Sequence, residues 1–161
     1  MSAEIRPMKP SEFPCLREFL YDAIFIPEGA APPDAAILDA PDLQVYLRNF
    51  GSEAQDRALA GICRGRIVGA VWTRIMNDYG HLDSETPSLA VAVAAGWRGY
   101  GIGTALMQGM LHLLRSEGVR RLSLSVQKKN RAAGLYRRLG FETVGETEEE
   151  YQMLYRFPGA E

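Results

Sequence analysis

The chain has 161 residues, which suits a single domain over residues 1–161, and its 47% hydrophobic and 24% charged residues are ordinary for a globular protein. The formal net charge of −2 gives no overall basic field, which argues against nucleic-acid binding, and the two cysteines, Cys15 and Cys63, lack the spacing of metal ligands, so we predict no metal site. Since the N-terminus lacks an apolar signal core and no segment is apolar for about 18 residues, we expect no membrane span and a cytoplasmic location.

The first third of the chain is predicted to form a strand followed by two helices. Residues 4–9 indicate a short strand, and residues 11–25 an amphipathic helix with Ser11 as its N-cap. The Pro-, Gly- and Ala-rich segment 26–37 indicates a loop. A second helix is expected over 40–51, ending at a glycine that suits the position just beyond a helix end.

The middle of the chain is predicted to form strands. Residues 57–65 and 66–77 are rich in β-branched and apolar side chains and are joined by a tight hairpin signal, Arg64-Gly65-Arg66. Residues 87–95 alternate bulky and small apolar side chains. A strand that is apolar on both faces is expected near the centre of a sheet.

The last third begins with a helix that opens at the glycine-rich stretch 98–104 and has one apolar stripe. A strand over 120–127 and a short helix over 130–140 follow, and strands at 141–146 and 151–157 flank an acidic turn. The chain contains no internal repeat and no linker. The order of elements therefore predicts one mixed α+β domain.

Three alternating glycines, Gly99, Gly101 and Gly103, stand between the 87–95 strand and the helix that follows. The first N–H groups of a helix lack internal partners and lie at its positive end, so this arrangement is typical of an anion site. Two phosphate-loop patterns fail, because no Lys follows Gly103 and the spacing G-x-G-x-x-G is not met. The alternative is a loop that only packs a strand against a helix.

The spacing R-G-x-G-x-G, followed by a small residue and an apolar helix, resembles the pyrophosphate loop of the GNAT superfamily of N-acetyltransferases. A second stretch resembles the family's N-x-x-A-x-x-x-Y-x-x-x-G-F signature, at Asn130, Ala133, Tyr136, Gly140 and Phe141. This GNAT resemblance implies a mixed, mostly antiparallel sheet of about six to seven strands flanked by about four helices. It also implies that the strands around 88–94 and 121–127 splay apart and admit the cofactor.

The resemblance implies acetyl-coenzyme A as the acyl donor. It places cofactor contacts at Val91, Ala92, Val93, Arg98, Gly99, Tyr100, Gly101, Ile102, Gly103, Thr104, Asn130, Ala133 and Tyr136. The backbone N–H near Val93 is expected to stabilise the oxyanion. Tyr136 is the expected general acid for the departing thiolate, since a phenol has a pKa of about 10. The alternative is that Tyr136 is a core aromatic residue.

The sequence does not identify a single general base. Some family members carry Glu at the position of Ser88, and a serine hydroxyl cannot act as the base. The upstream candidates are Glu85, Asp83 and His81, acting through a water chain, with Glu85 favoured. The alternatives are that His81 is a surface or hydrogen-bonding residue and that bulk water is the base.

The resemblance places acceptor specificity in segments 21–34, 77–85 and 145–151, which are rich in Asp and Glu. An acid-lined rim attracts cations, so we hypothesise a cationic acceptor, either a small polyamine-like or aminoglycoside-like molecule or a peptide amino terminus. The alternative is that the acidic turn is only solvated. Four aromatic residues are candidates either for the acceptor cleft or for the core: Tyr21, Phe25, Trp72 and Tyr79.

The favoured function is an acetyl-coenzyme A-dependent N-acetyltransferase acting on a primary amine. A non-catalytic acyl-coenzyme A binding or sensing module is the alternative, because it would keep the glycine loop and lose the chemistry. A nucleotide-phosphate-binding protein is disfavoured by the two failed loop patterns. Dimers are common in the family, so a homodimer is possible, although no interface signature is visible.

Overall fold

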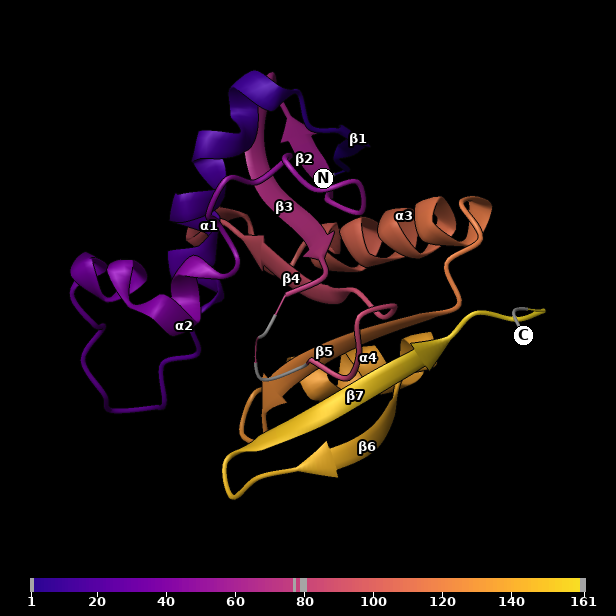
Figure 1. Ribbon diagram of the computed structural model, residues 1–161. Helices are drawn as coiled ribbons and strands as arrows, with labels where there is room; N and C mark the ends of the chain where they lie inside the picture. The colour runs from indigo at the N-terminus through magenta and orange to yellow at the C-terminus, as the bar shows by residue number, and fades with distance from the viewer. Residues whose placement is uncertain (1, 77, 79–80, 160–161) are drawn as a thin grey trace.

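The computed structural model describes residues 2–76, 78 and 81–159, and the strands in this part of the chain form one seven-stranded sheet (Figure 1). The order across the sheet is β1-β2-β3-β4-β5-β7-β6, and only the β4–β5 pair is parallel. The strands are β1 (Glu4–Pro7), β2 (Arg57–Cys63), β3 (Arg66–Arg74), β4 (Ser88–Val93), β5 (Arg121–Gln127), β6 (Glu142–Glu146) and β7 (Glu150–Arg156). This mixed, mostly antiparallel sheet confirms the predicted fold class, and β4 is central as expected.

Helices cover both faces of the sheet (Figure 1). They are α1 (Leu16–Ala23), α2 (Pro41–Gln44), α3 (Ile102–Ser116) and α4 (Ala132–Leu139), with short 3₁₀ turns η1 (Pro10–Cys15), η2 (Ala35–Asp39) and η3 (Ala95–Trp97). The periodicity of β4 explains the division into two faces. Its bulky Leu89 packs in the core beneath α3 and α4, whereas its small Ala92 joins the core beneath α1.

The two halves of the sheet separate between β4 and β5. The register joins these strands only at Ser88 opposite Ser123, where the Ser123 N–H donates to the Pro87 carbonyl at 3.0 Å. Figure 1 shows the two strands diverging beyond this point. The predicted splay between the strands is therefore present, and it leaves backbone groups of both strands free of ladder partners.

The two N-terminal helix predictions are wrong in extent. Instead of a helix over 11–25 with Ser11 as cap, η1 begins after Lys9 and gives way to the short α1, because Pro14 has no N–H to donate. Instead of 40–51, α2 ends at Gln44. Beyond it the backbone carbonyls of Val45, Tyr46 and Arg48 accept hydrogen bonds from the β3 side chains of Trp72 and Arg74.

The β2–β3 hairpin is confirmed. Arg64 (φ 53°) and Gly65 (φ 75°) both have positive φ, as the twist of a tight hairpin requires. Both cysteines are free thiols. Cys63 is buried, whereas Cys15 is only half-buried at the end of η1.

Candidate active site

A cleft of about 1330 Å³ opens where β4 and β5 diverge. Its walls come from the segment after α1, from α2 and Tyr46, from β4 and the start of α3, and from β5 and α4. Val91, Ala92, Val93, Arg98, Gly103, Asn130 and Tyr136, seven of the residues predicted from sequence, line this cleft. The strand gap, the glycine loop and the second signature therefore converge on one place.

The glycine loop forms the turn into α3. Gly99 (φ 85°) and Gly101 (φ 80°) adopt the left-handed conformation that glycine tolerates best, and Gly101 is the N-cap of α3. No side chain caps this helix end. The N–H groups of Ile102, Gly103 and Thr104 therefore have no partners within the helix, and they stand at its positive end, which suits an anion.

Arg98 ties the loop to both walls of the cleft. Its Nε donates to the Val93 carbonyl at 3.1 Å, and its Nη2 donates to the Asp22 carbonyl at 3.1 Å. The guanidinium thus holds the end of α1 against the end of β4. A guanidinium has five N–H donors, so donors remain for an anion at the loop.

The edge of β4 that faces β5 offers unpaired amides. In an antiparallel ladder alternate residues bond to the partner strand, and the Ala94 N–H donates to Val68 of the β3 side at 2.8 Å. Ala92, opposite Ala70, belongs to the same set. The N–H groups of Val91 and Val93 consequently point away from β3, toward the gap. This is the orientation that an oxyanion donor needs.

Asn130 and Tyr136 come from the start and the buried side of α4. The Asn130 Oδ1 accepts from the Ala132 N–H at 2.9 Å, in the turn just before α4. Tyr136 is 9% exposed, packs near Phe141 and also lines the cleft. Burial raises the pKa of Tyr136 to about 12, so its hydroxyl is protonated at neutral pH and can serve as a proton donor.

The other predicted cofactor residues lie around the cleft without their side chains lining it. Gly99, Tyr100 and Gly101 form the exposed turn, and Tyr100 is 51% exposed. Thr104 lies in the first turn of α3. The side chains of Ile102 and Ala133 are buried in the core, so only their backbone is available to a ligand.

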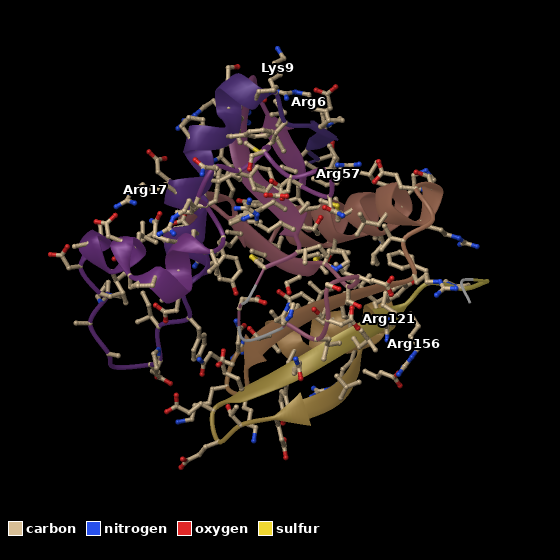
Figure 2. The ribbon with its side chains drawn as sticks, in the orientation of Figure 1. Arg6, Lys9, Arg17, Arg57, Arg121 and Arg156 are labelled. Carbon is tan, nitrogen blue, oxygen red and sulfur yellow. The ribbon has the colours of Figure 1, made fainter. Side chains whose placement is uncertain are left out.

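The favoured base candidates lie elsewhere. Glu85 is exposed and lines a separate pocket with Arg121 and Leu114. Asp83 pairs with Arg121 at 2.9 Å and accepts from the Glu85 N–H. Arg121 lies opposite Arg156 in the β5–β7 ladder, and Figure 2 shows both side chains near the C-terminal end of the chain.

His81 also stands outside the residues that line the cleft. It is half-buried, and its backbone carbonyl accepts a hydrogen bond from the Gln152 Nε2 at 3.1 Å. Within the described residues its Nδ1 has no hydrogen-bond partner. The geometry thus gives neither His81 nor Glu85 a direct path to the cleft.

A tyrosine and an aspartate that sequence reasoning did not join are hydrogen-bonded beside the cleft. The Tyr46 hydroxyl donates to the Asp78 Oδ2 at 2.8 Å, and the Ser88 Oγ donates to the Asp78 Oδ1 at 2.8 Å. Tyr46 and Glu150 both line the cleft. These residues come from three distant segments of the chain, so no local spacing could have linked them.

Only some of the residues predicted for acceptor binding line the cleft. Tyr21, Phe25, Asp22 and Glu28 line the cleft, whereas Trp72 is fully buried beneath α1 and is a core residue. The prediction for Tyr79 lies outside the described residues. Within the described ranges no three His, Cys, Asp or Glu side chains gather as a metal ion would need. No helix in the same ranges is long and apolar enough to cross a membrane.

Comparison with known proteins identifies the fold and its relatives. The sequence model of the acetyltransferase (GNAT) family matches residues 20–141. A mycothiol acetyltransferase of Saccharomonospora viridis is 32% identical over 123 residues, covering 74% of this chain and 40% of the relative. A mycothiol acetyltransferase of Thermobifida fusca is 40% identical over 82 residues, covering 48% of this chain and 25% of the relative. The chain thus spans less than half the length of either curated relative.

A solved structure has the same fold. The PaiA N-acetyltransferase of Thermoplasma acidophilum, crystallised in complex with coenzyme A, superposes with a TM-score of 0.71. The superposition covers 98% of this chain and 100% of that chain at 16% sequence identity. At this identity the likeness supports the fold alone, and it confirms the predicted fold class.

Proposed function

Because the chain belongs to the acetyltransferase (GNAT) family, we propose that it transfers an acetyl group from acetyl-coenzyme A to a primary amine. The observation that carries the proposal is the cleft itself. The uncapped start of α3, the unpaired edge of β4 and the hydroxyl-bearing Tyr136 all border it. A thioester lying in the strand gap would have an anion site at one end and a proton donor at its sulfur.

The loop residues are proposed to hold the pyrophosphate. The amides of residues 102–104 supply N–H donors without competing partners, and Arg98 adds a positive charge beside them. A Cβ added at Gly103 would have the Val93 side chain as its nearest neighbour, at 3.8 Å, which is an ordinary van der Waals contact. Packing within the protein therefore does not require glycine there, which supports close approach of a ligand as the reason.

The chemical step is proposed to be direct attack of the amine on the thioester. The neutral amine nitrogen forms a bond to the acetyl carbon and gives up one proton to a base or to water, and the developing oxyanion accepts from the β4 amides near Val93. The carbon–sulfur bond then breaks, and the Tyr136 hydroxyl gives its proton to the departing thiolate.

The acceptor is proposed to be a cationic amine, either a small molecule or a peptide amino terminus. Asp22, Glu28, Asp42 and Glu150 line the cleft, whereas its cations are Arg98 at the glycine loop and Lys129 and Arg131, which flank Asn130 near the start of α4. An acidic wall raises the local concentration of a cation. A cytoplasmic location and a homodimer stay predictions from the sequence.

The proposal is tested by calorimetric titration with coenzyme A and acetyl-coenzyme A, followed by thiol release over a panel of amines. The panel contains polyamines, an aminoglycoside, peptides with free amino termini, anionic amino acids and the desacetyl precursor of mycothiol, because two curated relatives are named for mycothiol. Binding with turnover of a cationic amine supports the proposal. Binding without any turnover would identify an acyl-coenzyme A-binding module, and absence of binding would refute both.

A further inference from the structure

Glu150 lies on the opposite side of the sheet from Tyr136. Side chains alternate along β7, and Tyr151 and Met153 pack with Tyr136 in the core beneath α3 and α4. Glu150 therefore projects to the other face, where α1 and α2 lie. Both Glu150 and Tyr136 nevertheless line the same cleft, because the gap between β4 and β5 opens the sheet from one face to the other.

Asp78 is fixed close to this carboxylate. Both of its carboxylate oxygens are occupied, one by the Tyr46 hydroxyl and one by the Ser88 Oγ, each at 2.8 Å. Ser88 itself faces Ser123 at the last point where β4 and β5 touch, with the two Oγ atoms 3.4 Å apart. Asp78 is thus a negative charge held in place by two hydrogen bonds at the apex of the gap.

Two of the carboxylates that line the cleft, Asp22 and Glu150, have a raised pKa. Burial raises the pKa of Asp22, but the positive charge of Arg98 beside it opposes the rise. The pKa of Glu150 is raised first by burial and then by the negative charges of Glu149 and Asp78. A raised pKa makes a carboxylate a stronger base nearer neutral pH. Tyr46 faces the pair, and its own pKa is raised by burial and by the charges of Asp78 and Glu150, so it stays neutral. The cations of the same cleft are Lys129, Arg131 and Arg98.

Resting on the proposed function, we propose that Glu150 is the general base that removes the proton from the acceptor amine, and that Asp78 is a positioning residue that acts on Glu150 through its charge. The acid and the base then lie on opposite faces of the open sheet, with the thioester between them. As the nitrogen–carbon bond forms, the amine proton passes to a Glu150 carboxylate oxygen. As the carbon–sulfur bond breaks, the Tyr136 proton passes to sulfur. The extra proton on Glu150 and the missing one on Tyr136 re-equilibrate with solvent.

The test measures kcat and KM for the best amine acceptor between pH 5.5 and 9.5, together with acetyl-coenzyme A binding by calorimetry. Glu150→Gln is expected to lower kcat by about 100-fold, within the range of a lost general base, and to remove the acidic limb of the profile. Cofactor affinity is expected to stay unchanged. Glu142→Gln, which removes an exposed carboxylate of β6 in the same hairpin, is the matched control.

Two further variants test whether neighbouring negative charges set the pKa of Glu150. Asp78→Asn and Glu149→Gln each remove a negative charge that raises the pKa of Glu150, so each is expected to move the acidic limb to lower pH while turnover persists. Glu149 is exposed, so its substitution does not endanger folding.

An active Glu150→Gln enzyme with an intact acidic limb would overturn the assignment, and loss of that limb in Glu85→Gln instead would give the role to Glu85. A wild-type protein without turnover of any amine would overturn the proposed function and this assignment with it.

Discussion

The buried ion pair between Asp56 and Arg74 offers the sharpest stability test. The Asp56 carboxylate accepts from the Arg74 Nε and Nη2, each at 3.1 Å, and from the N–H groups of Gly51 and Glu53. The two side chains are only 0% and 7% exposed. The Arg74 Nη1 also donates to the carbonyls of Val45 and Arg48, so this pair anchors the segment after α2 to β3.

Asp56→Asn keeps the side-chain shape but leaves a buried guanidinium without its counter-charge. Breaking one partner of a buried pair costs about 3–5 kcal/mol. For 161 residues the entropy of unfolding is about 0.34 kcal/mol/K, from about 2.1 cal/mol/K per residue. The melting temperature is therefore expected to fall by about 9–15 °C.

The assay compares thermal and urea unfolding of the wild type with two variants. Asp39→Asn is the control, because it breaks a surface pair with Arg17, 3.1 Å long, whose side chains are 45% and 68% exposed. Such pairs contribute at most about 1 kcal/mol, so a fall of no more than about 3 °C is expected. The reasoning is refuted if Asp56→Asn loses no more stability than Asp39→Asn. Adding Arg74→Met to Asp56→Asn should recover part of the loss, since the orphan charge is then removed.

Three further predictions concern the loop, the proton donor and a half-buried carboxylate. Gly101→Ala places a Cβ at φ 80° where no atom lies within 4 Å, so only backbone strain of about 1–2 kcal/mol is expected, with weaker coenzyme A binding. Gly65→Ala in the β2–β3 hairpin is the matched control, with the same strain and unchanged affinity in calorimetry. Tyr136→Phe should lower kcat by about 100-fold with unchanged cofactor affinity, and unchanged turnover in the thiol-release assay would remove Tyr136 from the mechanism. The Glu12 pKa is lowered from its ordinary 4.5 to about 2, chiefly by the hydrogen bond from Arg6, so this contribution to stability is complete above pH 4.5 and is lost as the pH falls toward 2. An NMR titration should show a Glu12 pKa near 2, rising toward 4.5 in Arg6→Met.

The part of the site that sequence could predict is the part built from contiguous residues. Gly99 and Gly101 are needed because the turn into α3 requires positive φ, and the Asn130 side chain accepts a hydrogen bond at the start of the helix that carries Tyr136. Each of these requirements acts over a few neighbouring residues, so it can be recognised in the local sequence. The same is true of the β2–β3 hairpin, where Arg64 and Gly65 make the turn.

What sequence could not predict was assembled from distant segments. Tyr46 bonds to Asp78 across 32 residues, and Glu150 joins them from the last strand. The candidate base Glu85 lines a separate pocket beside Arg121, so its role through a water chain stays a prediction. The predicted length of α2 was wrong for a related reason. Arg74, which belongs to a later strand, donates to the carbonyls of Val45 and Arg48, which would otherwise accept hydrogen bonds within a longer helix.

The single register pair between β4 and β5 has a mechanical consequence. With Ser88 opposite Ser123 as the lone ladder step, the seam between the two half-sheets relies on the helical layer beneath it more than on backbone hydrogen bonds. A ligand that fills the cleft would contact both half-sheets and would therefore hold them together across this seam. At 100 times its dissociation constant such a ligand adds about 2.7 kcal/mol, or roughly 8 °C of melting temperature. Amides of β5 beside the seam should then gain the most protection from hydrogen exchange.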